Sequence, residues 1–224
     1  ETFWFLLQFN AIFSSVSAVA VTLSFRTKYA GWVVLGLVIG WSAGFVWKTQ
    51  SQFRVLFGMW QYCSILSVFQ VFPDMMLDKV FGALNFPDDG CWKIFGSVSC
   101  YMAFMWTIPL VLVVASCSPN KGDFGSFPRL SELFCAAVIA LFLFGASEQL
   151  THPLQLWQPT DRVKQKMGHI ALYVLPAETL LGPTTLIGYR WSNQLPLRHK
   201  VVAAASVSCV YAIVLAICFI IIEL

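Results

Sequence analysis

An acidic residue, Glu178, lies in the middle of the apolar segment 168–191, which is long enough to cross a lipid bilayer. An ionisable group at that depth is costly to retain and usually marks a functional position. No lysine or arginine lies near the middle of any other apolar segment. Because burial without a cationic partner disfavours a charged carboxylate, we predict that Glu178 is a protonated acid in an apolar pocket. Such a group donates a hydrogen bond or a proton.

Two prolines flank this acid in the sequence. Pro176 removes an amide donor and leaves the carbonyl group of Leu172 without its helical partner, and Pro183 does the same to Thr179. Membrane helices tolerate such breaks where they face protein or a polar cavity. A purely structural alternative is that Glu178 bonds one of the freed carbonyl groups, or a polar residue on another helix, and only fixes the bundle.

A second polar group closes the preceding apolar segment. Glu148 and His152 are four residues apart, so on a continuous helix they would share a face. As catalytic candidates they would tune or reload the acid as a carboxylate–histidine proton relay at the mouth of the cavity, whereas helix capping and snorkelling at the membrane interface are the structural alternatives. Together with His169 they could also hold a metal ion, but His152 precedes a proline, which disfavours helical geometry. We predict no metal site and no bound cofactor.

Aromatic and polar side chains within the apolar segments could line a pocket around the carboxyl group. Aromatic faces suit a polyene or a carbocation, whereas core packing and hydrogen bonds between helices are the structural alternatives. The candidate ligand-binding residues are Tyr173, Trp106, Tyr101, Gln61 and Trp60.

The composition indicates a protein embedded in a membrane. Apolar residues make up 58% of the 224 residues and charged residues only 11%, with a mean hydropathy of +0.73. A soluble domain has about twice that charged fraction. The net charge of +3 is spread over short connecting segments, which excludes the basic stripe of a nucleic-acid-binding protein.

The pattern predicts an all-α, polytopic transmembrane helix bundle, formed by residues 1–224 as a single multi-pass domain. Seven segments are long enough to span the membrane: 3–25, 30–47, 53–72, 94–117, 131–150, 168–191 and 199–223. The second is the shortest, and six spans result if it does not cross. Lysine and arginine are divided seven against seven between the two sides, so the positive-inside rule assigns no orientation.

The longest connection predicts a short amphipathic helix that lies in the membrane interface. Apolar residues recur there with helical spacing, and two aspartates share the opposite face: Leu77, Val80, Phe81 and Leu84 against Asp74 and Asp78. The segment ends in a turn at Asp88 and Asp89.

Small residues four positions apart predict close helix packing. They form one ridge on the second segment and another on the seventh: Gly36, Gly40 and Gly44, and Ala204, Ser208 and Ala212. Five of the seven cysteines lie inside apolar spans, Cys91 and Cys117 flank one span, and none forms a CxxC pair. We predict that they fill helix interfaces and form no disulfide.

The stretch Leu175-Pro176-Ala177-Glu178 resembles the Pro-x-Glu motif of the small membrane-embedded lycopene cyclases. Chain length and span count are similar to those of the compact membrane terpene cyclases of fungal meroterpenoid pathways. The resemblance implies acid-initiated cyclisation of an isoprenoid with Glu178 as proton donor. Separately, the stretch from Phe86 to Gly90 and the segment from Met105 to Leu110 resemble the signature of an uncharacterised membrane family.

Three functions compete. The first is an enzyme, such as a cyclase or isomerase, that handles a lipophilic isoprenoid- or carotenoid-like molecule. The second is a non-catalytic accessory subunit of a photosynthetic or energy-converting membrane complex, which binds pigment, quinone or lipid and contacts other membrane subunits. The third, a transporter, is disfavoured because no internal repeat is evident and ion-coupling residues are few.

Overall fold

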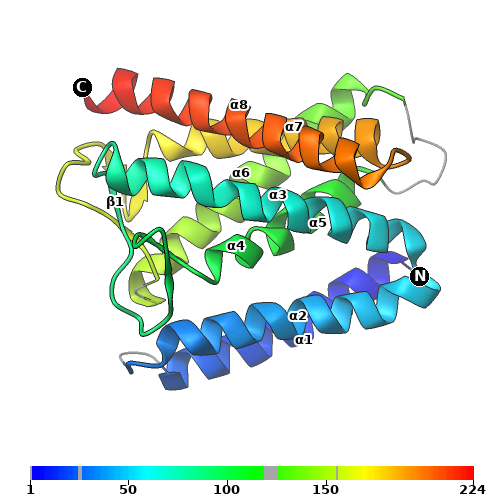
Figure 1. The fold of residues 1–224 in the computed structure, drawn as a ribbon, viewed down its shortest axis with the longest axis horizontal. Coiled ribbons are helices and arrows are strands. Elements are labelled where there is room, and N and C mark those ends of the chain that lie inside the picture. Colours follow the sequence, from blue (N-terminus) through cyan, green and yellow to red (C-terminus); the bar gives the residue numbers. More distant parts are fainter. Residues whose placement is uncertain (1, 25–26, 119–125, 155) are drawn as a thin grey trace.

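A computed structural model describes residues 2–24, 27–118, 126–154 and 156–224, and the chain forms a helical bundle with short strands at one end (Figure 1). In chain order the elements are α1 (Thr2–Ser24), α2 (Ala30–Gln52), α3 (Arg54–Lys79), β1 (Leu84–Asn85), β2 (Lys93–Ile94), β3 (Val98–Ser99), α4 (Met102–Met105), α5 (Thr107–Cys117), α6 (Leu130–Leu154), β4 (Gln158–Pro159), β5 (Lys166–Met167), β6 (Ile170–Ala171), α7 (Val174–Ser192) and α8 (Leu197–Glu223).

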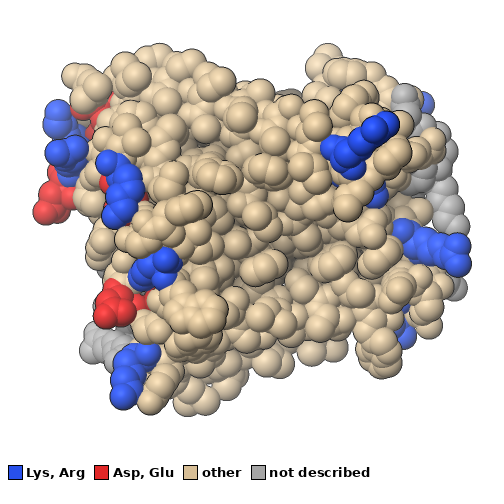
Figure 2. Space-filling view, viewed as in Figure 1, with Lys and Arg blue, Asp and Glu red and all other residues tan. Residues whose placement is uncertain are grey.

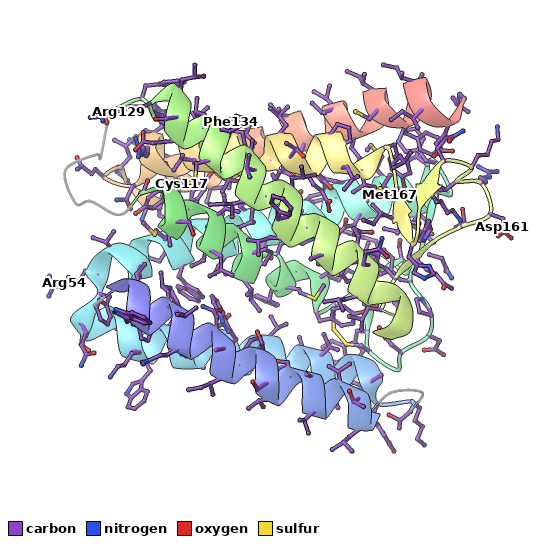
Figure 3. All side chains as sticks on the ribbon, turned by 180° about the vertical axis from the view of Figure 1, so that it is seen from behind. Arg54, Cys117, Arg129, Phe134, Asp161 and Met167 are labelled. Carbon is purple, nitrogen blue, oxygen red and sulfur yellow. A yellow bond between two sulfur atoms is a disulfide. The ribbon has the colours of Figure 1, made fainter. Side chains whose placement is uncertain are left out.

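Five helices in the described part of the chain are long and apolar enough to cross a membrane, namely α1, α2, α3, α6 and α8. Charged side chains gather at the two ends of the bundle and leave an uncharged band between them (Figure 2). Arg54 and Arg129 lie at one end, Asp161 lies at the other, and Phe134 points outward from α6 (Figure 3). Such a band matches the hydrocarbon core of a bilayer.

The helices pack around α7, which lies between α6 and α8 and also contacts α5. Helix α3 packs against α8, α4 and α5. The α1–α2 hairpin lies along one edge of the bundle (Figure 1), and α1 is mostly exposed. The buried core therefore lies among α3 and α5 to α8.

One order of elements occurs twice. A long helix, a short strand, a β-hairpin and a helix follow one another in α3 to α5, and again in α6 to α7. Strand β1 pairs antiparallel with β4, so that Leu84 faces Pro159 and Asn85 faces Gln158. The expectation that the chain has no internal repeat is therefore wrong at the level of structure.

Two predicted spans begin later than the apolar pattern indicates. Segment 94–117 starts with the β2–β3 hairpin and becomes helical at Met102, and segment 168–191 starts in the β5–β6 hairpin and becomes helical at Val174. Glycines with positive φ, Gly96 and Gly168, occupy these hairpins, and this conformation does not continue into a helix.

The predicted interfacial helix is absent. Residues 74–79 are the last turns of α3, which continues through Pro73, and the chain leaves the helix at Val80. Asp74 and Leu77 are both buried. The segment therefore does not have one acidic face in water and one apolar face in lipid, as an interfacial helix would. The predicted exposure of Asp74 is wrong because a proline within a membrane helix need not end it.

The small-residue ridges have different outcomes. On α8, Ala204 is fully buried and the hydroxyl group of Ser208 donates to the carbonyl oxygen of Phe69 on α3 (3.0 Å). On α2, in contrast, a Cβ atom added at Gly36 or Gly40 would meet nothing within 4 Å. The predicted close packing is therefore confirmed on α8 and not found at these two glycines of α2.

One cysteine prediction is wrong. Cys91 and Cys100 form a disulfide at the end of the bundle that carries the strands. Cys100 was assigned to a membrane span, but it follows β3 and therefore lies outside a helix. Cys63, Cys117, Cys135, Cys209 and Cys218 are free, as predicted.

Candidate functional site

Three carboxyl groups from three helices line one cavity near the strand-bearing end of the bundle. Asp74 comes from α3, Glu148 from α6 and Glu178 from α7. All three side chains are buried. The other lining residues are Leu77, Leu84, Met102, Trp106, Trp157, Pro159, Ala171, Tyr173, Val174 and Tyr211. None of them is a lysine, arginine or histidine, so the described lining carries no cationic side chain.

Glu178 is the most deeply buried of the three acids, with 1% of its surface exposed. Its Oε2 atom has no hydrogen-bond partner among the described residues. A buried polar atom without a partner is costly, and native structures usually satisfy it with water or a ligand. The cavity leaves about 20 Å³ for the centres of water-sized molecules, which is enough for about one water. The geometry therefore leaves this oxygen available to a small polar group or a reacting atom.

The other two acids are each held by a tryptophan. The indole Nε1–H of Trp106 donates to Oδ2 of Asp74 (3.2 Å). The indole Nε1–H of Trp157 donates to Oε1 of Glu148 (3.0 Å). These bonds fix the two carboxyl groups at the cavity wall, whereas no corresponding indole holds Oε2 of Glu178.

Aromatic rings form much of the remaining wall. Trp106 contacts Tyr211 with ring centroids 6.1 Å apart and Phe144 at 5.2 Å. Tyr173 packs edge-on against Phe219 at 5.1 Å. Ring faces of this kind attract a positive charge, most strongly where water is excluded. The cavity thus combines buried carboxyl groups with the aromatic side chains of Trp106, Trp157, Tyr173 and Tyr211.

Sequence reasoning treated Glu178 as a lone buried carboxyl and missed Asp74. The structure places Asp74 in the same cavity because α3 continues for about two further turns beyond the expected end of the span. The helical spacing of Gln70, Asp74 and Leu77, all buried, was the available signal. Trp157 was also missed as a cavity residue, since it lies in the connection after α6.

The remaining predicted site residues separate into two groups. Tyr173 and Trp106 line the cavity, and Tyr101 lies beside it, where its hydroxyl group donates to the carbonyl oxygen of Leu156 (3.2 Å). Gln61 and Trp60 do not belong to the site. They lie about 20 Å from Asp74 along α3.

Gln61 instead accepts a hydrogen bond from Nζ of Lys200 (3.2 Å), and Trp60 stacks on Phe57 (5.8 Å between ring centroids). His152 belongs to α6, but its side chain lies outside the described part of the structure. His169 is exposed at the tip of the β5–β6 hairpin. Within the described residues, no group of three or more histidine, cysteine, aspartate or glutamate side chains could hold a metal ion.

Comparisons with known proteins give a family but no activity. No curated protein matches the chain, and no solved structure matches it. Residues 71–222 match a family described as a domain of unknown function, DUF6989. The matched region begins near the end of α3 and includes the three acids and the rest of both repeated units. Because the match covers more than half of the 224 residues, the chain belongs to the DUF6989 family.

Proposed function

We propose that the protein is a multi-pass membrane enzyme that cyclises or isomerises an unsaturated isoprenoid-like lipid, with Glu178 as the proton donor. The observation that carries the proposal is the buried Oε2 atom of Glu178, which lacks a partner among the described residues and borders a cavity walled by aromatic rings. Apart from the three acids, the cavity wall is mostly aliphatic and aromatic, which suits contact with a double bond of a hydrocarbon chain. In the proposed membrane arrangement, α5 and α7 add two crossings to those of the five long apolar helices, which gives seven.

The chemistry needs only proton transfer. The O–H bond of Glu178 breaks as its proton forms a C–H bond with one carbon of a double bond, and the other carbon becomes cationic. A second double bond of the same molecule attacks this carbon and closes a ring. The aromatic faces of Trp106 and Tyr173 stabilise the cations, much as preorganised dipoles stabilise other transition-state charges.

A C–H bond next to the final cation then breaks, and its electron pair forms a new double bond. The proton passes to the carboxylate of Glu148, and its return across the cavity to Glu178 restores the starting state. Substrate and product contain the same atoms, so the reaction requires no oxidant or reductant.

The test uses the purified protein in lipid nanodiscs in D₂O with geranylgeraniol, squalene or lycopene. We expect an isomeric product; deuterium at the protonated carbon appears in the first turnover, and in later turnovers only as far as the two acids exchange their protons with D₂O. Glu178→Gln keeps the side-chain shape and removes the transferable proton, so the rate should fall by about 10²- to 10⁴-fold. Mass spectrometry of the product measures both effects.

Glu223→Gln is the matched control. Glu223 is also a buried glutamate at this end of the bundle, but it accepts hydrogen bonds from the backbone of Lys164 and Gln165 outside the cavity. Its variant should retain turnover if it folds. A folded Glu178→Gln protein with unchanged turnover contradicts the proposal. Co-purification of foreign subunits without turnover supports the accessory role instead.

The repeated order of elements favours a second candidate, transport of a lipophilic molecule, since transporter folds are often built from repeats around a central site. The test measures whether unaltered geranylgeraniol crosses the membrane of proteoliposomes when a pH gradient is applied. Movement that is driven by the gradient and lost in Glu178→Gln would favour transport over catalysis.

A further inference from the structure

A second, larger cavity lies between α4–α5 and α6. Its volume is about 320 Å³, within the range of ligand pockets. The walls are almost entirely apolar. They are formed by Met102, Met105, Trp106, Ile108, Pro109, Leu112, Leu143, Phe144, Ser147, Glu148, Leu150, Leu156, Trp157 and Glu178. We call this cavity the α5–α6 groove.

The α5–α6 groove adjoins the carboxyl cavity and shares part of its wall. Five residues line both: Met102, Trp106, Glu148, Trp157 and Glu178. A molecule that fills the groove therefore ends at the carboxyl groups of Glu148 and Glu178. The two acids are also nearly the only polar side chains of the groove, since Ser147 is the remaining one.

The groove opens on the side of the bundle that lipid would cover. Ile108 and Leu112 on α5 and Leu143 on α6 are half-buried, and Leu150 is 59% exposed. These residues belong to apolar helices. The opening thus borders the hydrocarbon region of a bilayer, where a hydrocarbon chain is soluble.

A polar pocket lies on the opposite side of the carboxyl cavity. It has a volume of about 410 Å³ and is lined by Asp78, Gly82, Leu84, Asn85, Gln158, Pro159, Thr160 and Asp161. Leu84 and Pro159, which face each other across the β1–β4 pair, line both this pocket and the carboxyl cavity. The acids are therefore separated from polar surroundings by one strand pair and joined to the lipid side by an apolar groove.

We propose that the α5–α6 groove binds the hydrocarbon tail of a linear isoprenoid, which enters sideways from the bilayer and presents a double bond to Glu178. This inference rests on the proposed function and assigns its substrate a class and a route. The two methionines, Met102 and Met105, are flexible and polarisable, and they suit a chain with kinks and double bonds. The polar β1–β4 side excludes the same chain.

Photolabelling tests the route directly. The probe is geranylgeraniol that carries a diazirine on its chain, added to the protein in nanodiscs, and peptide mass spectrometry locates the label. We expect label on α5 and α6 at groove residues. Leu143→Trp fills the groove and should reduce this label by about tenfold, which corresponds to 1.4 kcal/mol.

The chain offers a matched control groove of about 280 Å³ between α7 and α8, lined by residues such as Ile187 and Val202, which does not reach the carboxyl groups. Ile187→Trp should leave the label on α5 and α6 unchanged. If Leu143→Trp does not fold, Leu112→Phe obstructs the groove from the opposite wall and should have the same effect.

The outcomes separate this inference from the proposed function. Glu178→Gln should label normally, because glutamine keeps the shape of the Glu178 side chain at the inner end of the groove. If the unaltered protein is labelled in the groove but shows no turnover, the proposed chemistry is wrong and the route still holds. Label that is confined to the α7–α8 groove, or that persists in both obstructed variants, overturns the route. Equal labelling by a diazirine-bearing palmitic acid overturns the isoprenoid assignment and indicates bulk lipid.

Discussion

The close approach of α6 and α7 gives the sharpest stability prediction, at Gly182. A Cβ atom at this position would lie 2.4 Å from the carbonyl oxygen of Ala136 and 2.7 Å from Cβ of Ala140. Neither atom can move without shifting the α6 backbone. Overpacking of this kind costs about 1–3 kcal/mol, and replacement of a helical glycine by alanine returns about 0.5–1 kcal/mol. We therefore expect Gly182→Ala to lower the free energy of unfolding by about 1–2 kcal/mol.

Gly36→Ala is the matched control, because its Cβ meets nothing within 4 Å. It should be neutral or stabilise the protein by up to about 1 kcal/mol. Reversible unfolding in mixed detergent micelles measures both variants. Gly182→Ala also wedges α7 away from α6, so Glu178 moves relative to Glu148 and turnover should fall. Equal stability of the two variants would refute the packing that positions these acids.

Two further predictions concern the ends of the bundle. Arg190 is 3% exposed and pairs with Glu132 through two hydrogen bonds of 2.6 and 3.0 Å. Because Glu132→Ala leaves the buried cation without this carboxylate, it should lower the free energy of unfolding by about 3–5 kcal/mol. Glu132→Asp should recover part of this loss. A loss below about 1 kcal/mol, the value of a solvent-exposed ion pair, would show that the buried pair is not formed. We predict that the Cys91–Cys100 disulfide faces an oxidising compartment. A maleimide should then modify these two thiols only after reduction, and in sealed vesicles only from that side. Modification without a reductant contradicts the disulfide, and modification from the opposite side contradicts the orientation.

The sequence predicts the helical membrane class and the buried acid because both depend on local composition. Glu178 interrupts a long apolar run, and nothing but burial explains its position. Helix boundaries were harder to predict from the sequence, because a hairpin with apolar residues such as Ile94 or Ile170 has the same hydropathy as a turn of helix. Only the positive φ angles of the intervening glycines distinguish the two.

The composition of the carboxyl cavity could not be derived from sequence, since its residues come from five helices (α3, α4, α6, α7 and α8) and from the segments between them. Asp74 follows a proline, so its segment was interpreted as a new surface helix and not as the end of α3. Glu148 was identified as an acid but not as a partner of Trp157. Such contacts join residues far apart along the chain, and spacing rules report only on neighbours within one helix.

The repeated order of elements has a consequence for the symmetry of the cavity. Tyr101 and Tyr173 each directly precede the helix of their unit, and five positions later one unit carries Trp106 and the other Glu178. The corresponding positions of the two units therefore differ in chemistry, an indole in one and a carboxyl group in the other, and both side chains line the same cavity. The cavity is accordingly asymmetric, with an acidic flank and an aromatic flank, although the order of elements around it is repeated.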